Sequence, residues 1–325
     1  LLVYSGNHQF TLEKDQIDQI RLITGINDYN FEWVLEPGKD FQTPEAIMGF
    51  SQRGLNGMSQ VFHKLLRDRV ARGEYQYADR PIVINNWEAT FFDFDDKKLD
   101  QIIDEAKPLG IEMFVLDDGW FGHRNDDNSS LGDWFVNQDK LTGGLKRVAD
   151  RTHEHCMKFG LWFEPEMISV DSKLYKEHPD YALHEPNRGM TLSRNQLVLD
   201  FSRKEVVDNI YNQMCLILDK VPLDYIKWDF NRNLTEVFSS AADAEHQGEV
   251  SHRYVLGLYD LMERLVTRYP NILFEGCSGG GGRFDAGILY YMPQSWPSDD
   301  TDAVERLKIQ YGTSLTYPIS SMTAH

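Results

Sequence analysis

The sequence has few of the features that mark several classes of protein. Only three cysteines occur, Cys156, Cys215 and Cys277. Their odd number and wide spacing suit neither a disulfide framework nor a zinc site, so a reducing, cytoplasmic setting is predicted. No apolar run reaches the length of a membrane span, and the first residues are too polar for a signal peptide. The chain does not begin with Met, which suggests a segment cut from something longer.

Basic residues and cofactor motifs are also scarce. The chain has 33 Lys and Arg against 51 Asp and Glu, a formal charge of -18. This balance argues against nucleic acid and anionic membrane as partners. The ten His residues include no HExxH pair, and His153 and His155 face different ways in a helical pattern. We therefore expect no metal and no cofactor.

The pattern of apolar residues changes near residue 80. Residues 1 to about 75 predict short strands, such as 31–35, followed by a helix over 54–70. From Pro81 onward, buried strands alternate with amphipathic helices, which predicts a parallel sheet. The expected helices cover residues 99–109, 144–158, 204–220, 254–270 and a run after 302.

Nearly every predicted strand ends in polar residues. The six endings are "NNWE", "LDDGW", "WFEPE", "KWDFN", "FEGCS" and "WPSDD". A doubly wound sheet collects ligand groups at one switch point, whereas a (β/α)8 barrel collects them from many strand ends around one mouth. The sequence therefore predicts an α/β fold of the (β/α)8 (TIM) barrel type.

Asp229 lies in "DYIKWDFNR" (224–232), which otherwise predicts a buried strand. Successive strand residues face opposite ways, so Lys227, Asp229 and Asn231 share the face that points to the barrel axis. A cation, a carboxylate and an amide are costly in a core but suit a polar site. The alternative is a structural Asp229 paired with Lys227 or Arg232.

Further carboxylates follow two other predicted strands. Asp117 and Asp118 in "LDDGW" are candidate site residues, with metal ligation as the alternative. "WPSDDTDA" supplies Asp299, while Asp300 and Asp302 have helix capping as their alternative role.

Tryptophans and glycines also lie near the strand ends. Trp87, Trp162 and Trp296 could be core residues, but indoles beside carboxylates also suit a sugar, whose apolar face stacks on a ring. The glycines of "CSGGGGRFDAG" fit no phosphate-binding motif and predict a tight turn that lets backbone approach a ligand. Paired carboxylates, indoles and the absence of a cofactor motif point to glycoside hydrolysis.

Several motifs carry a more specific resemblance. "LEPGKDFQTPE", "GLNGMSQVFH", "FVLDDGWFG", "GLWFEPEM", "SRNQLVLDFS", "IKWDFNRN", "FEGCSGGGGRFD" and "QSWPSDDTDAVERLKIQYGTSLTYPISSM" resemble, in order and over most of the chain, the microbial α-galactosidases of glycoside hydrolase family 36. In that family a β-sandwich domain precedes the barrel. The resemblance implies that residues 1–75 are the end of such a domain plus a linking helix, and that 76–325 form the catalytic barrel.

The resemblance also implies roles for individual residues. Asp229 would be the nucleophile and Asp299 the general acid/base of a retaining double displacement on raffinose- or melibiose-type α-galactosides. Lys227 would lower the pKa of Asp229, and the two carboxyls would lie ~5–6 Å apart. The expected galactose contacts are Trp87, Asp117, Asp118, Trp162, Arg194, Lys227, Asn231, Cys277 and Gly279. Microbial relatives imply a homo-oligomer, a tetramer.

The strand count departs from a complete barrel. Because the family places its nucleophile after the fourth strand, "LVLDF" (197–201) is expected to be an extra segment. The barrel strands then number seven, with "SLTYPISSM" (314–322) as the seventh, and we expect the last strand and the C-terminal β-domain to be absent. A gap is therefore predicted between 314–322 and "IVINNW" (82–87), which should leave the chain unstable and inactive by itself.

Three alternative functions stay open. A raffinose or stachyose synthase uses the same two-step chemistry with a sugar acceptor. An α-N-acetylgalactosaminidase needs room at C2, which Cys277 and its neighbours are expected to fill. A non-catalytic sugar-binding module would not need both Asp229 and Asp299.

Overall fold

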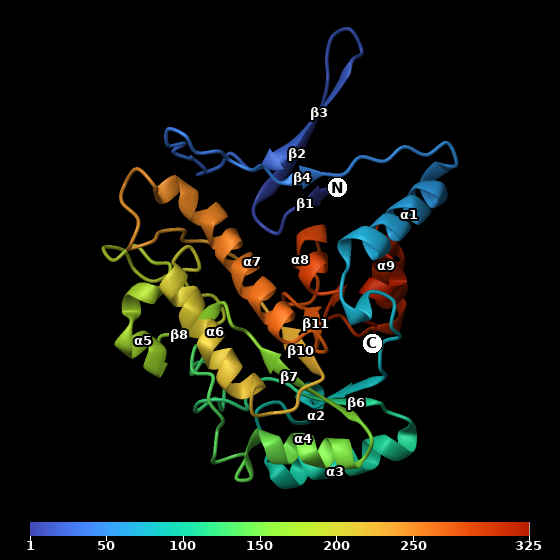
Figure 1. The fold of residues 1–325 in the computed structure, drawn as a ribbon, viewed down its shortest axis with the longest axis vertical. Helices are drawn as coiled ribbons and strands as arrows, with labels where there is room; N and C mark the ends of the chain where they lie inside the picture. The colour runs from blue at the N-terminus through green and yellow to red at the C-terminus, as the bar shows by residue number, and fades with distance from the viewer. Residues whose placement is uncertain (325) are drawn as a thin grey trace.

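The computed structural model describes residues 1–324, and a six-stranded parallel sheet lies at its centre (Figure 1). The sheet order is β12-β11-β10-β7-β6-β5, and every neighbouring pair is parallel. The sheet curls into a half-barrel, as expected of an incomplete TIM barrel. Its strands are β5 (Val83–Asn85), β6 (Met113–Leu116), β7 (Lys158–Phe163), β10 (Tyr225–Trp228), β11 (Leu273–Gly276) and β12 (Gln294–Ser295).

The two faces of β10 have different neighbours, as the alternation of a strand requires. Ile226 and Trp228 belong to the large apolar core under the helices. Tyr225 instead packs with Met113 and Val115 of β6 in a separate cluster on the concave face. Lys227, two residues on from Tyr225, therefore lies on the concave face with the predicted site.

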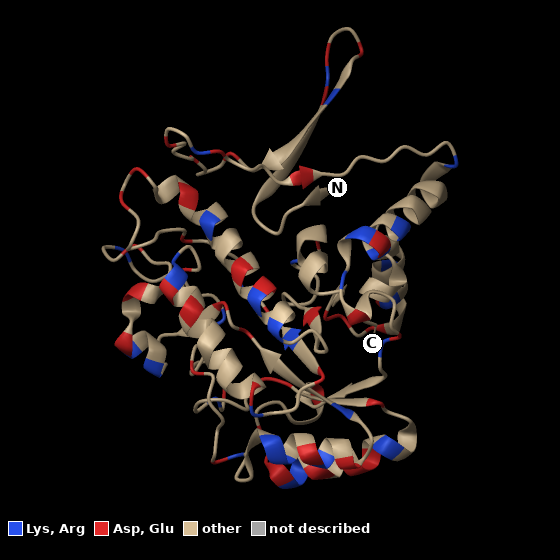
Figure 2. Cartoon of the chain, in the orientation of Figure 1, with Lys and Arg blue, Asp and Glu red and all other residues tan. Residues whose placement is uncertain are grey.

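Helices cover the convex side of the sheet, with α6 beside α7 and α3 beside α4 (Figure 1). Figure 2 shows charges of both signs along α3 and α4, as expected of solvated faces. None of the helices within residues 1–324 is long and apolar enough to cross a membrane. The helices of this part are α2 (Trp87–Thr90), α3 (Asp96–Ala106), α4 (Gly144–Glu154), α6 (Lys204–Leu218), α7 (Val250–Arg268), α8 (Ala286–Tyr291) and α9 (Ala303–Ser314).

The long segment between β7 and α6 forms a small sheet of its own. Its strands β8 (Met167–Ser169) and β9 (Gln196–Val198) pair antiparallel and do not join the main sheet. A short helix, α5 (Lys173–Glu177), lies between them. The prediction that "LVLDF" is an extra segment rather than a barrel strand is therefore confirmed.

The N-terminal segment consists of two small antiparallel ribbons and a helix. β1 (Leu2–Val3) pairs with β4 (Glu45–Ala46), and β2 (His8–Lys14) pairs with β3 (Ile20–Ile26) in a hairpin that projects from the rest (Figure 1). Helix α1 (Gly54–Leu65) follows and continues as a π-helical turn, Leu66–Val70, as predicted.

The predicted strand over 31–35 is wrong. This stretch has no regular secondary structure. Phe31 and Trp33 instead pack around the His252 ring of α7, at centroid distances of 6.2 and 5.6 Å. The backbone N–H of Val34 donates to Glu249. Contacts with a helix thus replace the strand partner that the alternating pattern suggested.

The predicted seventh strand is also wrong over most of 314–322. Helix α9 ends at Ser314, and Ile319–Ser321 is a 3-10 turn after Pro318. Only Met322 forms a parallel bridge, with Ser295 of β12. On the opposite edge, β5 pairs with β6 alone among residues 1–324, so the predicted gap beside β5 is present there.

Short 3-10 turns complete the secondary structure. They cover Glu74–Gln76, Lys107–Leu109, Pro179–Tyr181 and Gln247–Glu249.

Candidate active site

The predicted site residues lie at or just after the carboxyl ends of the sheet strands. In a parallel sheet these ends share one edge, so residues far apart in the sequence meet there. Contacts and charges described below link these residues, apart from Trp87, into one group. By strand, they are Trp87 after β5, Asp117 and Asp118 after β6, Trp162 in β7, Lys227, Asp229 and Asn231 in or after β10, Cys277 and Gly279 after β11, and Asp299 after β12, with Arg194 from the loop before β9.

Asp229 is a buried carboxylate surrounded by hydrogen-bond donors. Trp162 Nε1 donates to its Oδ2 at 3.1 Å, and the backbone N–H groups of Phe230 and Gly279 donate to Oδ1 at 2.9 and 3.4 Å. Burial alone would raise its pKa, but the charge of Lys227 and hydrogen bonds from the side chains of Asn231, Trp162 and Cys277 outweigh burial and hold the pKa of Asp229 below its ordinary value. Asp229 is therefore ionised at neutral pH.

Lys227 makes its ion pair with Asp117, not with Asp229. Its Nζ lies 3.0 Å from Asp117 Oδ2, and both side chains are largely buried. Arg232 binds the carbonyl oxygens of Thr191 and Gln196. Neither cation forms an ion pair with Asp229 within residues 1–324, so the purely structural explanation of Asp229 has no support.

Asp118 is held by a partner that the sequence did not reveal. Arg124 Nε and Nη2 donate to its two carboxylate oxygens at 3.0 and 2.8 Å, and both side chains are buried. Burial raises the pKa of Asp118, although the Arg124 charge opposes the shift. Arg124 is the second residue after "LDDGWFG". Its place in the loop after this motif was the only sign of a role.

Asp299 is exposed at the edge of the site, in the loop between β12 and α9. Partial desolvation by its loop and the negative charge of Asp229 raise the pKa of Asp299. The pKa values of these two carboxyls thus move in opposite directions. Such a separation assigns one carboxyl to act as a base or nucleophile and the other to act as an acid.

The neighbouring acidic residues of the Asp299 loop have local structural roles. Asp302 is the N-cap of α9, and its side chain accepts from the backbone N–H groups of Val304 and Glu305. Asp300 accepts from the backbone N–H of Asp302. The capping alternative is therefore confirmed for Asp302.

The glycine run forms a tight turn against the site. Gly279 and Gly280 adopt positive φ angles of 52° and 82°, a region that favours glycine. The Gly279 N–H also donates to Asn231 Oδ1 at 3.1 Å. Backbone thus approaches the side chains of Asp229 and Asn231, just after β10. The predicted tight turn is present, and its approach to a ligand stays a prediction.

The remaining predicted residues border this group. Burial raises the pKa of the Cys277 thiol well above its ordinary value, so Cys277 is a neutral buried group beside Asp229. Trp87 is half-buried and packs edge-on against Phe91 and Phe92. Arg194 is exposed, with a positive φ of 52°, and its charge acts on Asp299.

Sequence reasoning missed a buried carboxyl, Glu164, that lies behind Asp229. Its Oε1 accepts from Gln196 Nε2 and from the backbone N–H of Asn231, each at 2.7 Å. Burial and the charge of Asp229 raise the pKa of Glu164 to about 8, which favours its neutral form beside the ionised Asp229. The polar strand end "WFEPE" was the available signal.

No metal centre is evident among these residues. Within residues 1–324 there is no group of three or more His, Cys, Asp or Glu side chains placed to hold an ion. Asp117 and Asp118, the candidates for metal ligation, instead bind Lys227 and Arg124.

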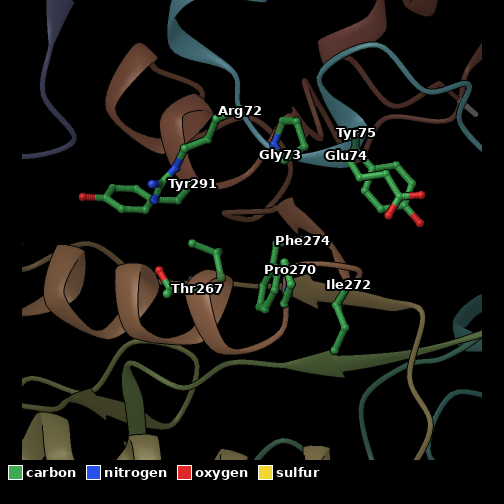
Figure 3. A pocket seen from close by; sticks show the side chains of 11 residues that line it. Arg72, Gly73, Glu74, Tyr75, Thr267, Pro270, Ile272, Phe274 and Tyr291 are labelled. Carbon is green, nitrogen blue, oxygen red and sulfur yellow. The ribbon is translucent and has the colours of Figure 1, made fainter.

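A cavity of about 230 Å³ lies at the amino-terminal ends of the sheet strands (Figure 3). Its lining includes Tyr75, Pro270 and Pro293, which precede β5, β11 and β12. In the described part of the chain no predicted site residue lines it. Because barrel enzymes place their chemistry at the carboxyl ends of the strands, we assign the site to that edge.

Comparisons with known proteins identify the family of the chain. Residues 40–325 match the family model "Melibiase", and residues 1–36 match the "Glycosyl hydrolase family 36 N-terminal domain". Alpha-galactosidase Mel36A of Lactobacillus acidophilus is 63% identical over 324 residues, which cover 100% of this chain and 44% of that protein. The chain thus spans less than half the length of this relative.

Solved structures give the same result. The GH36 alpha-galactosidase AgaA from Geobacillus stearothermophilus superposes with a TM-score of 0.98 at 57% identity, over 100% of this chain and 45% of that one. A variant of AgaA, 56% identical with the same TM-score and coverage, was solved in complex with raffinose. The family model spans most of the chain, and the chain belongs to the Melibiase family.

Proposed function

We propose that this chain forms the catalytic part of a retaining exo-α-galactosidase that removes terminal α-D-galactosyl residues from raffinose- and melibiose-type oligosaccharides. The observation that carries the proposal is the pair Asp229 and Asp299 at the carboxyl ends of the strands. The pKa of Asp229 is lowered and the pKa of Asp299 is raised. The relatives named as alpha-galactosidases support the substrate class.

In the first step Asp229 attacks the anomeric carbon and forms a covalent β-galactosyl ester. Asp299, whose raised pKa favours its protonated form, donates its proton to the departing glycosidic oxygen. Trp162 and the N–H groups around Asp229 hold its carboxylate in place for attack. Because Lys227 and Asp229 are largely buried, the Lys227 charge acts on this carboxylate with less screening than at the surface.

In the second step Asp299, now a carboxylate, removes a proton from water. The water oxygen attacks the anomeric carbon, the bond to Asp229 breaks, and α-galactose leaves. Two inversions give net retention. We keep a separation of ~5–6 Å between the two carboxyls as a prediction of this mechanism.

The sugar contacts follow from unused hydrogen-bonding capacity. A carboxylate offers about four acceptor sites. Lys227, Asn85 and the Asp118 N–H use three on Asp117, which leaves room for a hydroxyl donor. We propose that Asp117 and Asp118 bind the C4 and C6 hydroxyls that distinguish galactose.

Cys277, Gly279 and Asn231 are proposed to face the C2 side of the sugar, with Trp87 and Arg194 at the rim. We propose that the side chain of Cys277, which is buried, occupies the space that an acetamido group would need. This argues for galactose over N-acetylgalactosamine as the substrate.

Hydrolysis of 4-nitrophenyl α-galactoside by the full-length protein tests the proposal. We expect NMR to detect α-galactose as the first product. β-Galactose, or faster hydrolysis of the α-N-acetylgalactosaminide, would contradict it. Transfer to sucrose in place of hydrolysis would indicate a synthase, and tight binding without turnover would indicate a sugar-binding module.

Three broader expectations belong to the same proposal. The domain division is placed at residue 75, between an N-terminal β-domain and the barrel. The full-length protein is expected in the cytoplasm and as a homotetramer. Light scattering of the purified protein tests the oligomer directly.

A further inference from the structure

The position of Asp299 depends on a loop that has little regular structure of its own. Residues 296–302 connect β12 to α9 without helix or strand. A general acid must be held within a fraction of an ångström of its working position to be effective. Contacts from outside the loop must therefore fix its backbone, and two features supply them.

The first feature is the glycine turn after β11. A Cβ atom built on Gly280 would overlap the backbone nitrogen of Asp299 and lie 2.8 Å from the carbonyl carbon of Ser298. One built on Gly281 would overlap the carbonyl oxygen of Pro297 and lie 2.7 Å from its carbon. The loop therefore packs backbone to backbone on this turn, at a distance that only glycine permits.

The turn is itself tied to the nucleophile. Gly279 N–H donates to Asp229 Oδ1 at 3.4 Å, and Ser278 Oγ donates to the Phe230 carbonyl at 2.7 Å. Arg283, just after the turn, forms a buried bidentate ion pair with Glu166. One short rigid segment thus contacts the Asp229 carboxylate on one side and the Asp299 backbone on the other.

The second feature is Arg306 on α9, whose side chain is buried. Its Nη1 donates to the carbonyl oxygens of Ser298 at 2.9 Å and Asp300 at 3.4 Å, the residues on either side of Asp299. Its Nη2 donates to the Thr323 carbonyl at 3.1 Å. A charged donor thus holds the loop at a second place, apart from the glycine turn.

We propose that Gly280, Gly281 and Arg306 are positioning residues that set the separation between Asp299 and Asp229. They contact neither carboxyl with a side chain and act through the loop backbone. The inference rests on the proposed function of these two aspartates. A displacement of Asp299 by ~1 Å is enough to reduce acid catalysis about 10²-fold.

The first test is Gly281→Ala in the full-length protein, because Gly281, unlike Gly280, does not need a positive φ. We expect kcat/KM to fall about 10²-fold on raffinose, whose leaving group needs protonation. On 4-nitrophenyl α-galactoside, whose leaving group departs unaided, the expected loss is under about 5-fold.

Sodium azide gives a readout that general loss of structure would not produce. Azide attacks the anomeric carbon of the galactosyl-enzyme on the face opposite Asp229. A C–N bond forms, the C–O bond to Asp229 breaks, and its electron pair returns to the carboxylate. No proton moves, so the displaced Asp299 is not required. We expect azide to raise kcat of Gly281→Ala on the aryl substrate and to give α-galactosyl azide.

Arg306→Met provides a second variant that loosens the loop without adding atoms. The same substrate difference and the same azide product are expected. Gly189→Ala and Arg188→Met are matched controls, because a Cβ at Gly189 meets nothing within 4 Å and the Arg188 side chain is 79% exposed. Both controls should retain wild-type rates on both substrates.

The outcomes separate this inference from the proposed function. If the wild-type protein hydrolyses neither substrate, the proposed function itself is contradicted. With an active wild type, equal losses on both substrates and no azide product, in whichever variant folds, would overturn the inference. If neither variant folds, the two contacts serve stability and the inference is also overturned.

Discussion

Replacing Lys227 by Met tests the electrostatic design of the site most fully. Lys227 Nζ and Asp117 Oδ2 are 3.0 Å apart, with side-chain exposures of 13% and 4%. At an effective dielectric constant of about 20, their attraction is about 5.5 kcal/mol before desolvation is subtracted. Removing one member of a buried pair leaves the other unpaired and costs about 3–5 kcal/mol. Asn85 and the Asp118 N–H still bind Asp117, so we expect about 3 kcal/mol.

Lys146→Met is the matched control. Lys146 pairs with Asp150 on the surface of α4, with exposures of 64% and 48%. Exposed pairs contribute under about 1 kcal/mol. Urea unfolding of the two variants should therefore differ by about 2 kcal/mol or more in free energy.

The Lys227→Met variant should also change the pH dependence of activity. Lys227 lowers the pKa of Asp229, so its removal raises that pKa, and the acid limb of the kcat/KM profile should move to higher pH. The stability from the depressed Asp229 pKa is present above the ordinary aspartate pKa and is lost as pH falls through the folded value. In Lys227→Met the folded pKa lies nearer the ordinary value, so this contribution is smaller and its loss is complete at a higher pH. Equal unfolding energies for the two Met variants, or an unmoved acid limb, would refute the reasoning.

Three further predictions concern single aspartates. Asp229→Ala should lower turnover more than about 100-fold, with partial rescue by azide to β-galactosyl azide; an α-azide product would contradict the nucleophile assignment. Asp299→Ala should lose far more activity on raffinose than on 4-nitrophenyl α-galactoside, and equal losses would move the acid role to another residue. Asp302→Ala should destabilise the protein by about 1 kcal/mol in urea unfolding with little change in kcat, since it removes the N-cap of α9. A large kcat loss there would show that Asp302 does more than cap.

The alternation of side chains along a strand explains what could be predicted. Because residues two apart share a face, Lys227 and Asp229 were expected together on the concave side, and the cluster around Tyr225 agrees. Polar strand ends likewise indicated the edge where Asp117 and Asp229 lie. These features depend on the local spacing of residues, which can be read directly from a sequence.

Features that depend on distant partners could not be predicted. The charge of Lys227 acts on Asp229 as expected, but its ion pair with Asp117, 110 positions away, was not foreseen. Apolar residues over 31–35 and 314–322 suggested strands, yet Phe31 packs on His252 and Tyr317 packs on Phe284. In both stretches tertiary packing, not strand pairing, satisfies the apolar side chains.

Trapping the covalent intermediate tests the central claim most directly. The full-length protein is incubated with an activated 5-fluoro-galactosyl fluoride, which slows release of the sugar from the enzyme, and is then digested and mapped by mass spectrometry. The mechanism predicts one fluorogalactosyl adduct, on Asp229 in the peptide that contains "IKWDFNR". Labelling of Asp299 or of another carboxylate, or full inhibition without any covalent adduct, would contradict it.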